Sequence, residues 1–174
     1  ETMLSTLPWR PLESVSPEII ELVLSTLEVG TPEALWGVLN TLLLLTAEPN
    51  HPLNARFLHE WLAQISMPQR DAIWSAALLC NHDETTSSTQ RLLDWVNSRP
   101  DCNDIEDEAR LLLGLALGWM LATSHRPLRD YTTKALVRLF ESRLDLLHIW
   151  MQQFWEVNDP YIIERVLAVT YGAL

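Results

Sequence analysis

The positions at which helices are expected to begin recur along this chain with a double period, and this pattern constrains the fold most. The expected starts fall near Pro17, Pro32, Pro52, Pro68, Ser87, Asp104, Pro127, Arg143 and Pro160. Alternate starts are 35 or 36 residues apart up to Asp104 and 33 apart between Pro127 and Pro160. A repeating pair of short helices is typical of an α-solenoid. The sequence therefore predicts an all-α fold, a right-handed α-solenoid of HEAT/TPR-like antiparallel helix pairs with about nine helices.

Prolines and capping residues mark many of these starts. Proline is tolerated in the first turn of a helix because the N–H it lacks has no partner there. Ser16–Pro17 and Asp159–Pro160 place a capping side chain directly before such a proline. Ser66 with Gln69 fits the capping box, in which two side chains satisfy two backbone donors. The start positions are therefore predicted from specific local chemistry rather than from average helix propensity.

The helix expected from Asp104 to Ala122 differs from the others because it is apolar nearly all round from Leu111 onward. Such a helix must be covered on several sides, so it is predicted to lie deeper than its neighbours. Gly114 and Gly118, four residues apart, are expected to let another backbone approach closely. The spacing of alternate starts lengthens to 39 or 40 residues here, which predicts an irregularity in the array.

The sequence divides into a short lead-in and one long repeat domain. Residues 1–16 carry no helical period and are predicted to be an extended lead-in or linker, held by Trp9. Residues 17–174 are predicted to form a helical-repeat domain. The chain begins at Glu1 rather than Met and ends at Leu174 without a C-cap, so we expect a fragment of a longer protein.

Charge and apolar run length exclude two classes of partner. A net charge of −11 repels phosphate backbones, so no nucleic-acid binding is expected. The longest apolar run, from Leu111 to Ala122, has twelve residues, whereas a spanning helix needs about 20, so no membrane segment is expected. Cys80 and Cys102 form no C-x-x-C motif, which favours a reducing compartment and a cytoplasmic location.

Motifs for catalysis and cofactor binding are largely missing from the sequence. It contains no G-x-x-x-x-G-K-[ST] phosphate loop, no G-x-G-x-x-G and no G-x-S-x-G elbow. His59-Glu60 begins a zinc-protease pattern, but the second histidine is replaced by Ala63. We therefore expect a non-enzymatic chain with no catalytic, cofactor-binding or metal-binding residues.

One alternative keeps an enzymatic function open. His82-Asp83 forms an H-D dipeptide in an all-helical chain, and the further residues His51, His59, Asp130 and Asp145 flank it in the sequence. The order resembles the ligands of HD-type metal-dependent phosphohydrolases, in which a bound metal activates water. The competing interpretation is a histidine after a helix end among solvated acids. A small phosphohydrolase that uses His82-Asp83 is thus the alternative function.

A basic cluster lies on the helix that is expected to begin near Pro127 and at the start of the next. It comprises Arg126, Arg129, Lys134, Arg138 and Arg143. It is either a patch for an acidic partner or a salt-bridged helix face that includes Asp130 and Glu141. Lys134 is expected to pair with Asp130 at i,i+4. Arg129 lies toward the apolar edge, so we expect it to reach an acid or backbone carbonyl on a neighbouring helix.

The C-terminal third contains three sequence segments that resemble those of a known protein family. Ser124–Phe140 reads S-H-R-P-L-R-D-Y-T-T-K-A-L-V-R-L-F, and R-L-D-L-L and V-N-D-P-Y-I-I-E-R-V-L-A-V-T-Y-G follow at 143–147 and 157–172. These segments resemble the helical-repeat region of large bacterial STAND-type NTPases linked to antiphage defence, the AVAST group. The match is concentrated in residues 124–172 and includes Arg129, Asp130, Lys134, Asn158, Asp159, Pro160 and Tyr161.

The resemblance implies a role in recognition. In that family an effector and a central ATPase module precede a helical array that senses a viral protein and drives oligomerisation. None of the ATPase motifs occurs in this chain, so we expect a non-enzymatic segment that recognises or scaffolds a protein partner or neighbouring domains of the parent chain. A spacer between active modules is a further alternative. The expected partner-facing or inter-helix residues are Arg126, Arg129, Asp130, Lys134, Arg138, Asp159 and Tyr161.

Overall fold

The computed structural model describes residues 3–82 and 87–174, and every regular element in these ranges is helical. The elements are the 3₁₀-helices η1 (Met3–Trp9) and η2 (Leu12–Ser14), α1 (Pro17–Val29), α2 (Pro32–Leu44), α3 (Ala55–Gln64), α4 (Met67–Arg70), the π-helix η3 (Asp71–Ser75), α5 (Ala76–His82), α6 (Ser88–Asn97), α7 (Asp107–Met120), α8 (Arg126–Phe140), α9 (Leu144–Phe154) and α10 (Pro160–Ala173). Since α4, η3 and α5 are continuous, the described part of the chain has nine helices after residue 16. The predicted all-α class is confirmed.

Two helices begin later than predicted. The third helix, α3, begins at Ala55 rather than at Pro52, because Asn54 is the capping residue and its side chain accepts a backbone hydrogen bond of 2.9 Å. The helix α7 begins at Asp107 rather than at Asp104, whose carboxylate forms an ion pair in the preceding loop. The other starts lie within one residue of the expected positions. Prolines and capping residues therefore predict most helix starts correctly, although the side chain of Ser16 makes no capping hydrogen bond at the start of α1.

The expected extended lead-in is wrong for the described residues. Residues 3–9 and 12–14 form short 3₁₀-helices, and η1 packs against α2. Leu7 is 1% exposed and belongs to the hydrophobic core, whereas Trp9 is 85% exposed. Leu7, rather than Trp9, therefore anchors this segment.

The helix α7 is the most deeply buried, as predicted. From Leu112 to Met120 every residue is buried. A Cβ atom on Gly114 would lie 2.6 Å from Phe140, and one on Gly118 would lie 2.3 Å from Phe154. The close approach at these glycines is therefore made by aromatic rings of α8 and α9 and not, as expected, by another backbone.

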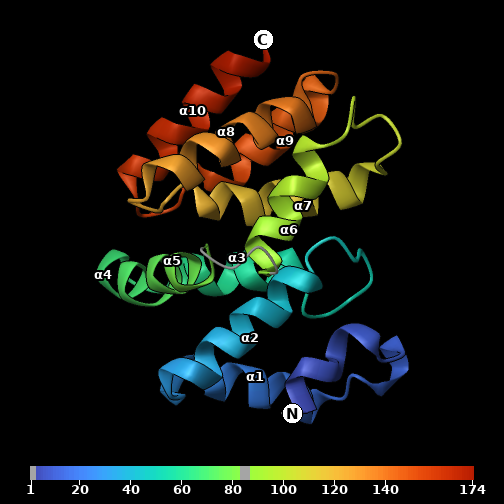
Figure 1. The fold of residues 1–174 in the computed structure, drawn as a ribbon, viewed down its shortest axis with the longest axis vertical. Helices are drawn as coiled ribbons and strands as arrows, with labels where there is room; N and C mark the ends of the chain where they lie inside the picture. The colour runs from blue at the N-terminus through green and yellow to red at the C-terminus, as the bar shows by residue number, and fades with distance from the viewer. Residues whose placement is uncertain (1–2, 83–86) are drawn as a thin grey trace.

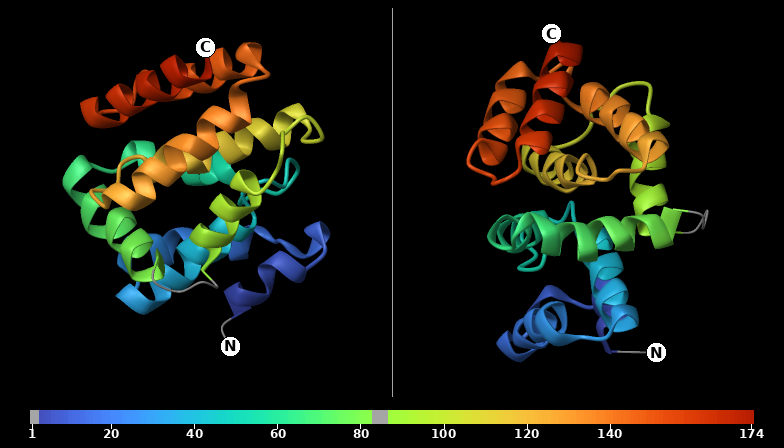
Figure 2. Two further views of the ribbon diagram at one scale, coloured as in Figure 1. Left: turned by 45° about the horizontal axis from the view of Figure 1, so that its top comes forward. Right: turned by 90° about the vertical axis from the view of Figure 1, so that its left-hand side faces the viewer.

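Helices are stacked in layers along the long axis of the molecule (Figure 1). The N-terminal helices α1 and α2 lie at one end, α3 to α5 form a middle layer, and α8 to α10 lie at the other end (Figures 1 and 2). In the C-terminal block, α7–α10, each helix packs on the next, and α7 packs on α9 and α8 on α10. In the N-terminal block, α1–α6, α2 packs on α1 and α3 and also on the distant helix α6, and α3 packs across on α7.

Packing between consecutive helices is irregular at two steps, from α3 to α4 and from α6 to α7. At these steps α3 packs on α7 and α6 packs on α8, more extensively than either packs on the helix that follows it in the chain. The lengthened spacing of helix starts after Ser87 predicts an irregularity at α7, which agrees with the step from α6 to α7 but does not predict the step after α3. Part of that apparent lengthening comes from the misplaced start at Asp104.

A π-helical turn, which the sequence does not predict, bends the helix between α4 and α5 at Asp71–Ser75. Such turns contain more residues per turn than an α-helix and often occur at functional sites. Trp74 within it is fully buried, and its indole Nε1–H donates to the carbonyl of Trp119 at 2.9 Å, near the end of α7. The turn thus joins the two blocks.

Candidate functional site

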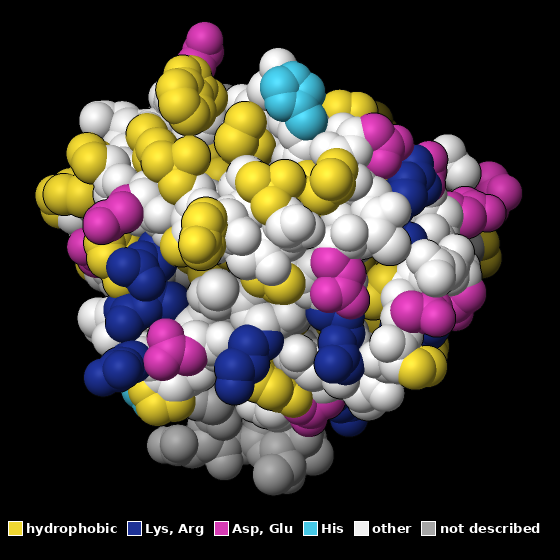
Figure 3. Space-filling model, turned by 90° about the horizontal axis from the view of Figure 1, so that it is seen from above, with side chains coloured by type: hydrophobic (Ala, Val, Ile, Leu, Met, Phe, Trp, Pro, Cys, Tyr) yellow, Lys and Arg dark blue, Asp and Glu magenta, His cyan; other side chains and the backbone are white. Residues whose placement is uncertain are grey.

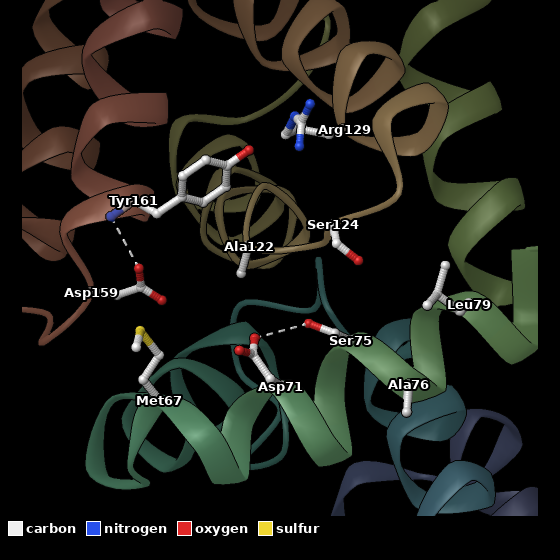
Figure 4. A pocket seen from close by; sticks show the side chains of 10 residues that line it. All are labelled: Met67, Asp71, Ser75, Ala76, Leu79, Ala122, Ser124, Arg129, Asp159 and Tyr161. Carbon is white, nitrogen blue, oxygen red and sulfur yellow. Dashed lines mark hydrogen bonds between the residues drawn. The ribbon is translucent and has the colours of Figure 1, made fainter.

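A pocket of about 570 Å³ lies at the junction of the two blocks (Figure 4). Its walls come from α4 to α5 on one side and from the end of α7, the start of α8 and the start of α10 on the other. It is lined by Met67, Asp71, Ser75, Ala76, Leu79, Ala122, Ser124, Arg129, Asp159 and Tyr161. Of the seven candidate residues, three meet here: Arg129, Asp159 and Tyr161.

Asp159 is the capping residue of α10, as its position before Pro160 predicts. Its Oδ1 accepts hydrogen bonds from the backbone N–H groups of Tyr161 at 3.1 Å and Ile162 at 3.2 Å. Its Oδ2 accepts from a terminal guanidinium nitrogen of Arg70 at 3.0 Å. Both oxygens of this buried carboxylate are thus satisfied, which offsets its desolvation.

Arg70 is the residue that sequence reasoning missed. Its side chain is 1% exposed and lies 89 positions from Asp159 in sequence, so no local pattern connects the two. Arg70 also donates to the backbone carbonyls of Leu62 at 3.0 Å and Ile65 at 3.1 Å. Its guanidinium carbon lies 4.8 Å from the ring centroid of Trp119. One side chain therefore ties α3, α4, α7 and α10 together beneath the pocket.

Arg129 does not make the contact expected for it. Its guanidinium carbon lies 5.7 Å from the ring centroid of Tyr161, and no acid or backbone carbonyl among the described residues accepts from its side chain. Its Nε atom is buried without a hydrogen-bond partner. Arg165, four residues after Tyr161, lies 5.3 Å from the same centroid and also has a buried, unpartnered Nε.

The opposite wall of the pocket is acidic and comes from the π-turn. Figure 4 shows Asp71 and Ser75 across the pocket from Arg129. The Ser75 hydroxyl donates to Asp71 at 3.4 Å, and within the described ranges no cation pairs with Asp71. Apolar atoms of Met67 and Leu79, both well exposed, line the mouth. The pocket thus offers a positive wall, a negative wall and apolar contacts.

The remaining candidate residues lie elsewhere on α8. Arg126 pairs with Asp130 at 3.4 Å on an exposed surface, in place of the expected pair of Asp130 with Lys134. Lys134 is exposed and forms no ion pair within the part of the chain that the structure describes. Arg138 donates to the backbone carbonyls of Asn97 at 2.6 Å and of residue 99 at 2.8 Å. Arg138 is thus an inter-helix tie, while Arg126, Asp130 and Lys134 face solvent.

A half-buried histidine of α3 contacts α7. His59 of α3 accepts a hydrogen bond at Nδ1 from the indole Nε1–H of Trp119 at 3.0 Å, and its ring centroid lies 5.3 Å from that of Phe154. Burial lowers the pKa of His59 to about 4, so the imidazole is neutral at neutral pH. The contact joins the two blocks and gives His59 a structural role.

The residues of the alternative metal site that the structure describes form no metal-binding group. Asp83 and the side chain of His82 lie outside the described residues, as does the side chain of Cys80. His51 is 8% exposed, and its Nδ1 accepts from the backbone N–H of Leu53 at 3.0 Å. Across the described ranges no three His, Cys, Asp or Glu side chains come together in an arrangement that could hold a metal ion.

The surface at the C-terminal end has a different chemistry from the pocket. Figure 3 shows hydrophobic side chains gathered on this face, with Lys and Arg side chains lying beside Asp and Glu. The exposed apolar residues of α9 and α10 and of the C-terminus are Leu144, Ile149, Leu167, Tyr171 and Leu174. Within the described ranges, no helix combines the length and hydrophobicity needed to cross a bilayer.

Comparisons with known proteins gave no match: no protein-family model, no curated protein and no solved structure matches this chain.

Proposed function

We propose that this chain is a non-enzymatic helical-repeat segment that recognises or scaffolds a protein, and that its helix pairs form a solenoid of the HEAT/TPR kind. The pocket at the block junction is the observation that carries the proposal. The pocket is lined by elements that lie far apart in sequence, and it opens to solvent. Its lining combines charges of both signs with apolar atoms. Such mixed chemistry suits a protein segment better than a single small metabolite.

The packing of the C-terminal block supports the solenoid. Each helix from α7 to α10 packs on the next helix, and α7 and α8 also pack on the second helix along the chain. That order is the one expected when antiparallel pairs stack in succession. The same block contains the sequence segments that resemble the helical array of STAND-type NTPases. We therefore propose that the chain belongs to a larger bacterial antiphage NTPase. A phosphate-loop motif upstream in the parent gene would support this origin.

A photo-crosslinking experiment tests the recognition function. A benzoylphenylalanine is placed at Leu79, which lines the pocket and is 39% exposed, or at Leu24 of α1, which is 37% exposed and does not line it. Extracts of infected and uninfected bacterial cells are then irradiated with each variant. We expect one discrete protein to be crosslinked from position 79 and not from position 24. Equal labelling from both positions, or none, would contradict the proposal.

A further inference from the structure

The cations of this acidic chain are mostly neutralised, and the exceptions are informative. Among the described arginines, five form ion pairs with carboxylates: Arg56, Arg70, Arg99, Arg126 and Arg143. Arg110 and Arg138 donate to backbone carbonyls instead. Arg129 and Arg165 have neither kind of partner within the described ranges, although both are half-buried.

The guanidinium groups of Arg129 and Arg165 both lie near the aromatic ring of Tyr161. Both lie over the ring of Tyr161, at 5.7 Å for Arg129 and 5.3 Å for Arg165, and both have a buried Nε without a partner. Placing two like charges near one ring and removing part of their hydration is unfavourable unless an anion compensates. Arg91 and Lys134 also lack an ion pair among the described residues, but both are exposed to water, which solvates them. Arg10 lacks one too, but its Nε–H donates to the Thr6 hydroxyl at 2.9 Å.

The surroundings define which anion fits. Asp71 and Asp159 line the same pocket, and the chain carries a net charge of −11. A doubly charged phosphate or a polyanion is therefore repelled, whereas a single carboxylate matches the planar fork of an arginine. On the wall opposite Arg129, a carboxylate oxygen of Asp71 can accept a hydrogen bond from a backbone N–H of the bound peptide. The mouth residues Met67 and Leu79 can contact an adjacent apolar side chain.

From this geometry we propose that Arg129, which lines the pocket, binds a carboxylate of a peptide segment whose neighbouring apolar side chain contacts Met67 and Leu79. Arg165, which does not line the pocket, adds positive charge beside the same Tyr161 ring. The inference rests on the proposed recognition function and specifies its partner as an acidic and apolar protein segment. The carboxylate belongs either to an Asp or Glu side chain or to the C-terminus of the partner.

An array of random ten-residue peptides, measured with the full chain, tests this proposal. One set of peptides ends in a free carboxylate, a second set ends in an amide, and a third set contains phosphoserine. We expect the bound peptides to be enriched in Asp or Glu next to an apolar residue, or in free C-termini. Binding to the amidated set identifies an acidic side chain as the source, and its loss identifies the chain terminus.

Matched variants locate the site. Arg129→Gln is expected to weaken binding of the selected peptides at least about tenfold, because charge-assisted hydrogen bonds are lost. Arg126→Gln, which removes an exposed arginine from the same helix, leaves binding unchanged. Arg165→Gln provides an independent second variant should the first fail to fold, which its melting temperature reports. Weakening by Arg129→Gln or Arg165→Gln, without an effect of Arg126→Gln, supports the proposal.

Three results would overturn the carboxylate site. They are a preference for phosphoserine or basic peptides, equal binding by the wild type and by Arg129→Gln and Arg165→Gln, and binding of no peptide at all. Crosslinking from position 79 tests recognition separately, so its success together with any of these results would leave the proposed function standing and remove only this site.

Discussion

The N-terminal block and the C-terminal block are built from helices of similar length that begin at similar intervals, yet they pack differently. In the C-terminal block the connections are short, at residues 121–125, 141–143 and 155–159, and consecutive helices are neighbours. In the N-terminal block, residues 45–54 separate α2 from α3, and α3 packs across on α7. Yet α3 packs on α7 more extensively than on α4, which follows it after residues 65–66, so connection length alone does not determine which helices become neighbours. The same period of helix starts is compatible with two packing orders.

The junction between the blocks is more polar than the contacts around α7 within the C-terminal block. The buried Arg70–Asp159 pair, the Trp74 indole bonded to a carbonyl and the His59–Trp119 hydrogen bond all cross the junction. Within the C-terminal block, by contrast, aromatic rings pack on the glycines of α7. Substitutions at the junction and within the block are therefore expected to have different costs and different pH dependences.

The largest effect is expected from breaking the junction ion pair. Arg70→Met leaves a buried Asp159 carboxylate without its cation and is expected to lower the free energy of unfolding by about 3–5 kcal/mol. Chemical denaturation at neutral pH measures this loss. Arg126→Met, which removes an exposed ion pair, is the control and is expected to change stability by less than about 1 kcal/mol. Similar effects of both substitutions would show that the junction pair does not hold the blocks together.

Acidification is expected to weaken the junction next. The pKa of His59 is about 4 in the folded chain, below the ordinary value of 6.5, so the unfolded chain binds a proton more readily. The neutral His59 imidazole therefore supports the folded state fully above pH 6.5. The free energy of unfolding decreases as the pH falls from 6.5 toward 4, because proton binding favours the unfolded chain. The loss reaches about 2–3 kcal/mol.

Urea denaturation across the range from neutral to mildly acidic pH measures the His59 effect. The side chain of Gln does not titrate in this range, so His59→Gln is expected to flatten the pH dependence relative to the wild type while keeping an acceptor for Trp119. An unchanged pH dependence in this variant would assign the acid sensitivity to other groups.

Within the C-terminal block, Gly118→Ala is expected to lower stability by about 1–3 kcal/mol, because the added methyl group would lie 2.3 Å from the ring of Phe154. Gly37→Ala in α2 is a matched control, since a Cβ atom added there would have nothing within 4 Å. At that position alanine is expected to stabilise the helix by about 0.5–1 kcal/mol. The melting temperatures of both variants measure these effects. A decrease for Gly118→Ala with an increase for Gly37→Ala would show that tight packing, and not the flexibility of glycine, sets the cost at position 118.

The smallest effect is expected at the pocket. Arg129 lies over Tyr161 without an ion pair among the described residues, so Arg129→Ala is expected to cost less than about 1 kcal/mol. The sequence alone predicts a clear destabilisation through an acid or carbonyl partner. A loss well above about 1 kcal/mol by denaturant titration would favour that sequence-based expectation over the contact with Tyr161.

Sequence reasoning succeeds where the information is local. The cap at Asp159 and the all-round apolar character of α7 follow from residues within a few turns. It could not predict the π-turn at 71–75, because an extra residue in a helical turn has no distinct residue pattern. It missed Arg70 because the partner is 89 positions away, and it placed Arg129 on a helix edge without knowing what faces that edge.

The indole of Trp119 gives this molecule an intrinsic optical signal. It is fully buried, hydrogen-bonded to His59 and 4.8 Å from the guanidinium of Arg70. Separation of the two blocks would expose it to water and shift its emission to longer wavelength, while protonation of the adjacent imidazole would quench it. Because the chain contains eight tryptophans, the difference in emission between the wild type and Trp119→Phe isolates this signal, which can report the opening of the junction without any attached label.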